Sequence, residues 1–260
     1  MTERTPAPES GRAQEQRTPA ELAELMGGRE VSLFFVRHGQ TVFNTEHRMQ
    51  GWTDSPLTEL GMTQIATVGR ALAPVPFDLA FSSDLRRCVT TTRGILEART
   101  DGLQETYHED LREWNFGGHE EMLSTQVWGK LIAKHQIEVD RELDAIQVLA
   151  EQLGWSGMFD GVAGLDETGQ SEYAAEIVIR ADRALAHVLM SLAELPGDEP
   201  VTGLVVSHGG FISTMLRQLD PSTAPDRIFP NCSVSTVTLR DGEWMIVAKG
   251  VEPQDFNYEV

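Results

Sequence analysis

The chain has 260 residues, 40% of them apolar, which is enough to bury the core of one full domain. Its 40 acidic side chains outnumber its 21 Lys and Arg, and the formal net charge of −19 argues against nucleic acid or an anionic membrane as a partner, because phosphate groups need a basic face. No stretch approaches the ~20 apolar residues of a membrane span and no hydrophobic signal core follows Met1, so a cytoplasmic protein is expected.

The N-terminal residues 1–28 are rich in Pro, Glu, Arg and Ala and are predicted to be a disordered tail, although residues 18–26 begin like a short helix. Residues 29–260 are predicted to form one domain. Apolar runs and helical periodicities then follow one another along the chain: strand 31–36, helix 58–72, strand 79–81, helix 85–98, helix 171–195, strand 201–207, helix 211–219, and strands 234–239 and 244–248.

This order predicts an α/β fold. Strands separated by helices imply a mostly parallel sheet with helices on both faces. The last two strands flank Asp241-Gly242, a hairpin signal that implies at least one antiparallel strand. Asp84 is the predicted N-cap of the helix at 85–98. The two cysteines, Cys88 and Cys232, are expected to be free thiols.

The pattern changes at about residues 119–170. Two predicted helices, 122–135 and 140–153, precede a glycine-rich loop at 154–161. This segment is interpreted as an insertion that covers a functional site; an ordinary helical hairpin packed on the sheet is the alternative. Three apolar residues of the loop form either a wall for a substrate's organic part or an anchor to the core: Trp155, Met158 and Phe159.

Residues that bind anions or attack phosphorus follow two of the predicted strands. Arg37 and His38 end one of them, and His208 and Gly209 follow another. Ligands of open α/β sheets bind at the carboxyl ends of the strands, so one site built from both halves of the chain is expected. A neutral imidazole can form a covalent phosphoryl intermediate, and arginine binds phosphoryl oxygens with its planar fork. The sequence therefore predicts an anion site with His38 as the nucleophile.

Further candidates lie outside these strand ends. Arg87 lies in the first turn of a predicted helix, whose free N–H groups would reinforce an anion site. His208 would donate to phosphoryl oxygens and, as imidazolium, stabilise the charge of the transferring group. Glu113 is the candidate acid for a leaving alkoxide, but spacing alone does not separate it from Asp110 and Glu109. A turn, cap or surface role is the alternative for each of these residues.

Taken together, these residues resemble the motifs of the histidine phosphatase superfamily, which includes the cofactor-dependent phosphoglycerate mutases. The matching segments are Val36-Arg37-His38-Gly39-Gln40-Thr41 with Asn44, residues 51–58, 61–64 and 82–87 with Thr91, residues 111–113 with 116–117, residues 206–210 and residues 230–233. They stand in family order over roughly residues 31–250. The ordered set carries the resemblance, since the Arg-His-Gly triplet alone is common.

The resemblance implies a phosphoglycerate mutase-like fold: a three-layer α/β/α sandwich, a mainly parallel sheet with one antiparallel edge strand, and the helical insertion over the site. It implies that His38 becomes phosphohistidine and that Glu113 is the proton donor. The residues that would bind the phosphoryl group or substrate are Arg37, Asn44, Arg87, His208, Gln40 and Gly209. Gly169-Gln170-Ser171 replaces the Gly-Glu-Ser triplet that is common in the family. The arginine that usually follows this triplet is not at its usual spacing; Arg180 and Arg183 are candidates.

No cofactor and no metal are expected. The family needs no metal, and the other histidines lack ligand spacing such as His-x-x-x-His. They are His47, His108, His119, His135 and His187.

A metal-independent phosphomonoester hydrolase that works on a small phosphorylated metabolite is therefore predicted. In residues 119–170 the only cations are Lys130, Lys134 and Arg141, among many carboxylates. A second phosphate group, which a mutase must hold, would be poorly received there. The alternatives are phosphoglycerate mutase-type phosphoryl transfer and a non-catalytic phosphate-binding module. The substrate's identity and the oligomeric state are not predicted.

Overall fold

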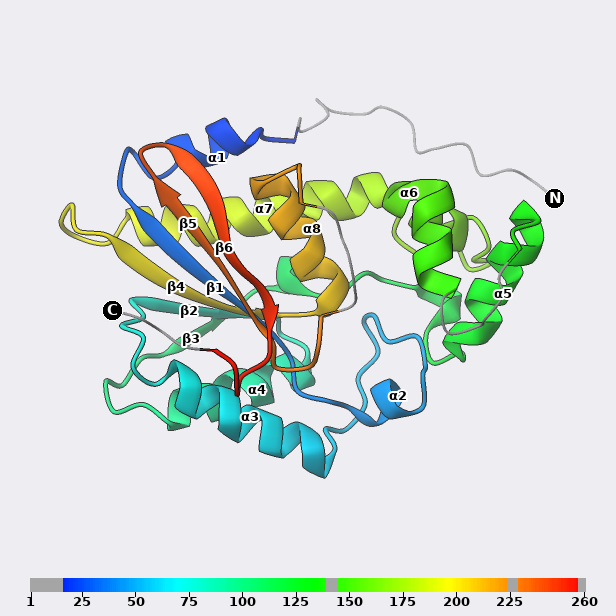
Figure 1. Ribbon diagram of the computed structural model, residues 1–260, viewed down its shortest axis with the longest axis horizontal. Coiled ribbons are helices and arrows are strands. Elements are labelled where there is room, and N and C mark those ends of the chain that lie inside the picture. The colour runs from blue at the N-terminus through cyan, green and yellow to red at the C-terminus, as the bar shows by residue number, and fades with distance from the viewer. Residues whose placement is uncertain (1–15, 139–144, 224–228, 257–260) are drawn as a thin grey trace.

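A six-stranded sheet in the order β3-β2-β4-β1-β5-β6 forms the centre of the computed structural model, which describes residues 16–138, 145–223 and 229–256 (Figure 1). The strands are β1 (Val31–Arg37), β2 (Leu79–Ser82), β3 (Glu105–Tyr107), β4 (Val201–Ser207), β5 (Val234–Arg240) and β6 (Glu243–Val251). The first four are mutually parallel, whereas β5 runs antiparallel to both β1 and β6. The predicted mainly parallel sheet with an antiparallel edge is confirmed; sequence analysis missed β3.

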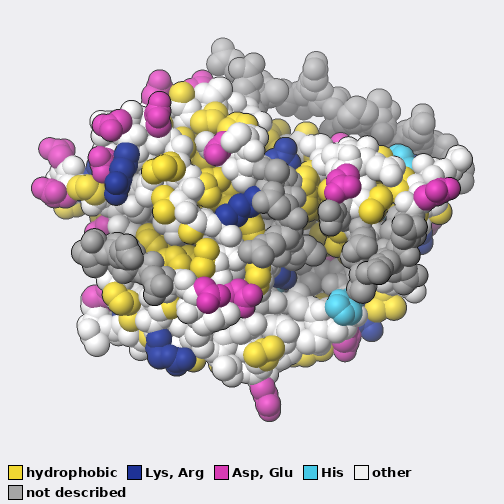
Figure 2. Space-filling model, viewed as in Figure 1, with side chains coloured by type: hydrophobic (Ala, Val, Ile, Leu, Met, Phe, Trp, Pro, Cys, Tyr) yellow, Lys and Arg dark blue, Asp and Glu magenta, His cyan; other side chains and the backbone are white. Residues whose placement is uncertain are grey.

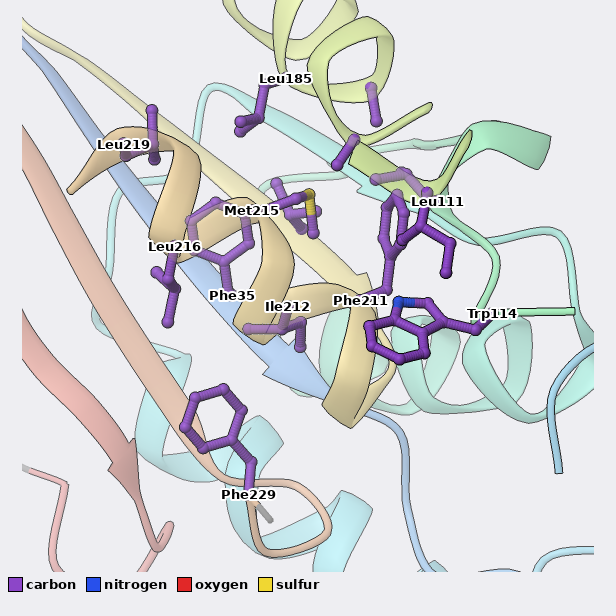
Figure 3. Close-up of a cluster of buried hydrophobic side chains, with 14 of the residues drawn as sticks. Phe35, Leu111, Trp114, Leu185, Phe211, Ile212, Met215, Leu216, Leu219 and Phe229 are labelled. Atoms are coloured by element: carbon purple, nitrogen blue, oxygen red, sulfur yellow. The ribbon is translucent and has the colours of Figure 1, made fainter. Parts of the chain in front are cut away.

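Helices cover both faces of the sheet and make three layers (Figure 1). One face carries α3 (Glu59–Leu72) and α4 (Arg86–Glu97); the other carries α1 (Pro19–Glu24), α7 (Ala174–Ala193) and α8 (Gly209–Leu219). Successive side chains of a strand point to opposite faces, so Phe34 packs in the α3–α4 core and Phe35 in the α7–α8 core. A strand buried on both faces must be apolar throughout, which explains the continuous run in β1. Figure 3 shows side chains of α8 gathered with Phe35.

The start of α4 differs from the prediction. Its N-cap residue is Leu85, with no side-chain cap, so the assignment of Asp84 as N-cap is wrong. The Asp84 carboxylate accepts instead from Nε of Arg112 at 2.7 Å. A charge-assisted bond to arginine is stronger than a neutral one to a backbone N–H, so the ion pair takes the carboxylate away from the helix end.

The folded region begins earlier than the predicted boundary at residue 28. A capping box between Thr18 and Glu21 starts α1, and Leu22 is fully buried. Arg17 pairs with Asp182 of α7, whose side chain is only 2% exposed. The short helix expected at 18–26 is confirmed as the six-residue α1, and the predicted tail is wrong for residues 16–28; residues 1–15 lie outside the described residues.

The insertion contains α5 (Ser124–His135) and α6 (Ala145–Ala163), which stand at the side of the sheet toward which β1 and β4 run (Figure 1). The predicted loop at 154–161 is wrong: α6 continues through it with a kink at Gly154, where φ is +68°. Gly161 serves packing, because a Cβ there would press on the Leu131 side chain of α5. Part of the predicted helix at 140–153 falls on residues 139–144, outside the described residues.

Short elements complete the chain: α2 (Val42–Thr45) and the 3₁₀ turns η1 (Glu109–Leu111) and η2 (Gly117–His119). Both cysteines are buried and free, as predicted. On the face drawn in Figure 2, acidic side chains are spread out with basic ones among them. Within the described residues, no helix is long and apolar enough to cross a membrane, and no group of three or more His, Cys, Asp or Glu is placed to hold a metal ion.

Candidate active site

The two predicted strand-end histidines meet. Arg37 of β1 lies in register with Ser207 of β4, so the residues that follow them are neighbours. The His38 N–H donates to the Ser207 carbonyl at 3.0 Å. The rings of His38 and His208 lie with centroids 5.2 Å apart and planes at 61°. Parallel pairing of two strands distant in sequence thus brings both imidazoles to one point at the carboxyl edge of the sheet.

His38 is prepared to act as a nucleophile. Its Nδ1 lies 2.8 Å from the Gly39 carbonyl oxygen, which can only accept, so Nδ1 carries the proton and Nε2 keeps its lone pair. Burial lowers the pKa of His38 well below its ordinary value, and the charges of Arg87 and Arg37 lower it further. The ring is therefore neutral near pH 7. The hydrogen bond to the Gly39 carbonyl determines that Nε2 is the nitrogen with the free lone pair.

Arg87, in the first turn of α4, is almost fully buried. Its guanidinium donates to the carbonyls of Gly51, at 2.6 Å, and Thr53, at 3.0 Å. It also donates to the Asp54 carboxylate at 2.7 Å and, through Nε, to Nδ1 of His208 at 3.2 Å. The turn at 51–54 thus holds a positive charge beside both histidines.

Glu120, to which sequence analysis assigned no role, holds that turn in place. Its carboxylate accepts from the N–H groups of Gly51 and Trp52, each at 2.9 Å, and of Phe116 at 3.0 Å. A side chain at Gly51 would collide with this carboxylate and with the Trp114 carbonyl, so glycine is required there. Glu120 therefore positions Arg87 through the turn between them. The only sequence signal was an acidic residue close after Gly117-Gly118.

His208 is fully buried and differs from the predicted imidazolium. Its Nδ1 accepts from Arg87, so in the neutral ring Nε2 carries the proton and donates to Oγ of Ser83 at 3.0 Å. Burial, and then the charge of Arg87, lower the pKa of His208 well below its ordinary value. His208 is thus a neutral hydrogen-bonding partner of Arg87 near pH 7.

Arg37 supplies a second positive charge. One of its Nη groups donates to the Phe229 carbonyl, whereas its buried Nε has no partner among the described residues. Gly209 leaves room for the guanidinium, since a Cβ there would lie 3.3 Å from Nε. A buried donor without an acceptor is costly, so this N–H is available to an oxygen of a bound anion.

The Glu113 side chain, from the segment after η1, lies against the N-terminus of α8. Its carboxylate accepts from the N–H groups of Gly210 at 3.0 Å and Phe211 at 2.9 Å. Burial raises the pKa of Glu113, and the N–H groups of Gly210 and Trp114 and the charges of Arg87 and Arg37 only partly oppose it. The geometry separates Glu113 from the other two candidates: Asp110 pairs with Arg183 at 2.7 Å, and Glu109 is exposed.

Arg180 holds the segment that carries Glu113. It is 5% exposed and donates to the carbonyls of Arg112, at 2.6 Å, and Glu113, at 3.1 Å. Its charge is paired with Glu172 at 2.7 Å. Of the two arginines considered from the sequence, Arg180 thus acts near the site through the backbone, and Arg183 pairs at the surface with Asp110.

Asn44 and Gln40 line the same cavity as Arg37 and Glu113. The Asn44 side-chain oxygen accepts from Nδ2 of Asn231 at 3.1 Å, and that Nδ2 also donates to the His38 carbonyl at 3.0 Å. The Gln40 side-chain oxygen accepts from Thr58 at 2.9 Å. Asn231 lies in the late motif that sequence analysis noted without a role, and it connects Asn44 to the backbone of the nucleophile.

A cavity of about 410 Å³ lies beside the buried His38 and His208, which are not themselves among its lining residues. Arg37, Asn44, Glu113 and Gly209 line one end, and the insertion lines the other with Trp128, Ile146, Trp155, Met158 and Phe159. The insertion therefore covers the site, as predicted, and is not a helical hairpin without a role in the cavity. Its apolar residues both line the cavity and belong to the packed core.

Comparison with known proteins gives one family. The family model of the histidine phosphatase superfamily (branch 1) matches residues 33–153 and 141–252. A protein from Salmonella arizonae described as a probable phosphoglycerate mutase GpmB is 31% identical over 221 residues, 83% of this chain and 88% of the relative.

Solved structures agree. A phosphoglycerate mutase from Bacillus anthracis str. Sterne matches with a TM-score of 0.77 and 28% identity, over 87% of this chain and 96% of that one. The mycobacterial glucosyl-3-phosphoglycerate phosphatase Rv2419c, in a structure with VO3, matches with a TM-score of 0.64 and 25% identity, over 86% and 99% of the two chains. Both the mutase and the phosphatase are thus similar to this chain over nearly their whole length.

Proposed function

The chain belongs to the histidine phosphatase superfamily, branch 1, and on that premise we propose that it is a metal-independent hydrolase of small phosphate monoesters. One observation carries the proposal: a neutral His38 with a free Nε2 lies beside two arginines, in a site whose carboxylic acid, Glu113, has a raised pKa. This set can attack phosphorus, bind the phosphoryl oxygens and protonate a leaving group.

In the first step Nε2 of His38 attacks the phosphorus atom while the bond to the ester oxygen breaks. The Glu113 carboxyl donates its proton to that oxygen, which leaves as an alcohol. Arg37 donates its unpartnered Nε–H to a phosphoryl oxygen, and the positive charge of the buried Arg87 stabilises the phosphoryl group from behind the histidines. The positive charge that forms on the phosphohistidine ring is stabilised by the Nδ1–H bond to the Gly39 carbonyl.

In the second step water attacks the phosphohistidine. Glu113, now a carboxylate, takes a proton from the water, the N–P bond breaks, and inorganic phosphate leaves. His38 returns to its neutral form with Nδ1 still protonated. No metal is needed in either step, because arginine N–H groups take the place of a cation at the phosphoryl oxygens.

The charge of the cavity favours hydrolysis over a mutase reaction. Apart from Arg37, the one Lys or Arg among the described lining residues is Arg48, and it is engaged by Glu46 at 2.6 Å and by the Glu121 carbonyl at 2.8 Å. Lys130 and Lys134 are exposed, and Arg141 lies outside the described residues. A second phosphate group on the substrate would find little positive charge at the insertion end.

Mutase-type phosphoryl transfer is the second candidate, and the names of the relatives favour it. The deciding experiment measures phosphate release from para-nitrophenyl phosphate and a panel of phosphorylated metabolites, with chelator present, for the wild type and His38→Ala. We expect release by the wild type and none by the variant, while a matched His135→Ala variant on the exposed end of α5 stays active.

Two other outcomes would contradict the proposal of a metal-independent hydrolase. Conversion of 3-phosphoglycerate to 2-phosphoglycerate that depends on 2,3-bisphosphoglycerate and releases no phosphate would establish the mutase. Loss of activity with chelator, restored by one specific ion, would refute metal independence.

A further inference from the structure

The insertion end of the cavity is aromatic. Trp128 comes from α5, and Trp155, Met158 and Phe159 come from α6. These side chains face the position that the leaving group occupies when the phosphoryl group is at Arg37, because both sets line one cavity. A ligand held by Arg37 must therefore place its organic part against this wall or leave apolar surface exposed to water.

The rings of the wall hold one another in place. Trp155 and Phe159 are stacked, with centroids 5.4 Å apart and planes at 18°. Trp128 meets Phe159 edge-on, with centroids 6.4 Å apart and planes at 84°. Trp128 and Phe159 are each only 7% exposed, so surrounding atoms limit their rotation. A wall that is rigid before the ligand arrives loses little conformational entropy on binding, and flat rings favour a flat partner.

Three polar lining residues near the phosphoryl end, Gln40, Asn44 and Gln50, already have partners for their side-chain oxygens. The Gln50 side chain accepts from Thr41 at 2.7 Å and donates to Ser55 at 3.2 Å. The side-chain oxygens of Gln40 and Asn44 accept from Thr58 and Asn231. A sugar hydroxyl that would donate to these oxygens finds them already paired, and a buried hydroxyl without a partner weakens binding.

We propose that the preferred substrates are phosphate monoesters of alcohols that carry a flat, apolar group, such as an aromatic ring, rather than sugar phosphates or phosphoglycerates. This inference rests on the proposed phosphatase function. Trp155 is its specificity-determining residue, because it lines the cavity and is the more exposed member of the stacked pair.

The test compares two esters with similar leaving groups, so that the difference reports binding rather than leaving-group chemistry. 2-Phenylethyl phosphate and glycerol 3-phosphate both release a primary alcohol. We expect kcat/KM to favour the phenylethyl ester by at least about tenfold, which corresponds to about 1.4 kcal/mol. Equal efficiency, or a preference for the glycerol ester, would overturn the substrate class alone. Phosphate release from neither ester would instead refute the phosphatase function.

Variants test whether Trp155 is the source of the preference for the phenylethyl ester. Trp155→Ala is expected to reduce the phenylethyl preference by about tenfold through a higher KM, with the glycerol ester changed by less than about threefold. Trp155→Phe keeps a flat face and should keep most of the preference. Trp244→Ala, a tryptophan of β6 that donates to the Pro19 carbonyl, is the matched control and should leave the ratio unchanged. An equal loss for both esters in Trp155→Ala would show a merely structural role and contradict the assignment.

Discussion

The two ends of the cavity are built in different ways. At the phosphoryl end, side chains from strand ends and helix starts are held by backbone contacts: Gly39 for His38, Gly51 and Thr53 for Arg87, and the start of α8 for Glu113. At the insertion end, rings of α5 and α6 are held by packing against one another. A change at the first end should therefore lower the rate on every substrate, whereas a change at the second should alter which substrate is preferred.

Removing the nucleophile gives the largest expected effect. His38→Asn should lower kcat by at least about 10⁴-fold on every monoester, because no other group supplies the lone pair to phosphorus. Acid-quench detection of a phosphorylated protein should show the intermediate in the wild type and none in the variant. A rate that falls by less than about tenfold on any ester would contradict the assignment.

Removing the acid comes next. Glu113→Gln should lower kcat/KM on an alkyl ester by about 10²–10⁴-fold. The loss on para-nitrophenyl phosphate should be much smaller, since nitrophenolate leaves without a proton. Equal losses on the two esters would place Glu113 in binding rather than in proton transfer. Asp110→Asn is the matched control, because its carboxylate pairs with Arg183 at the surface.

The pH profile should follow from both groups. The reaction needs neutral His38 and protonated Glu113. The pKa of His38 lies well below 6.5, so the ring stays neutral, and activity persists, to lower pH than for an ordinary histidine. The pKa of Glu113 lies above 4.5, so activity is lost as pH rises through that raised value. Profiles of kcat/KM should show an alkaline limb that Glu113→Gln abolishes; a limb that survives in the variant would have another source.

Replacing Glu120, which positions Arg87 at the phosphoryl end of the cavity, should lower the rate less than replacing His38 or Glu113. Glu120→Gln keeps the side chain's shape but weakens its bonds to Gly51 and Trp52, so the turn that holds Arg87 loosens. We expect kcat/KM to fall by about tenfold on all esters alike. The neighbouring Glu121→Gln, with an exposed side chain, should change little. A changed ranking of substrates in Glu120→Gln would contradict a role confined to the phosphoryl end.

The smallest rate effect is expected at the wall. Phe159→Leu should leave kcat/KM for glycerol 3-phosphate within about threefold and lower the free energy of unfolding by about 1–1.5 kcal/mol, because the buried ring is replaced by a smaller apolar group. Chemical denaturation measures the second quantity. Met190→Ala, exposed on α7, is the control for stability. A large loss on the glycerol ester would remove the distinction between the two ends.

Local pattern was sufficient for much of the fold and for the membership of the site. The continuous apolar runs at β1 and β4 identified doubly buried strands, and the Arg-His-Gly and Ser-His-Gly endings identified the residues that meet there. Glycine misled at 154–161, because a glycine that permits close helix packing, as Gly161 does beside Leu131, looks in sequence like a glycine that breaks a helix.

Other features required the folded chain. The charge state of His208 depends on burial and on Arg87, which is 121 residues away in the sequence, and the role of Glu120 depends on a turn 67–69 residues away. Spacing left Glu113, Asp110 and Glu109 open, the family resemblance favoured Glu113, and the folded chain shows that its carboxylate is the one that reaches the start of α8. Residue types and short-range spacing determine what chemistry a chain can carry and which segments form strands and helices. Protonation, positioning and the shape of the cavity arise from contacts between distant segments, whose burial and hydrogen bonds exist only after the sheet has paired.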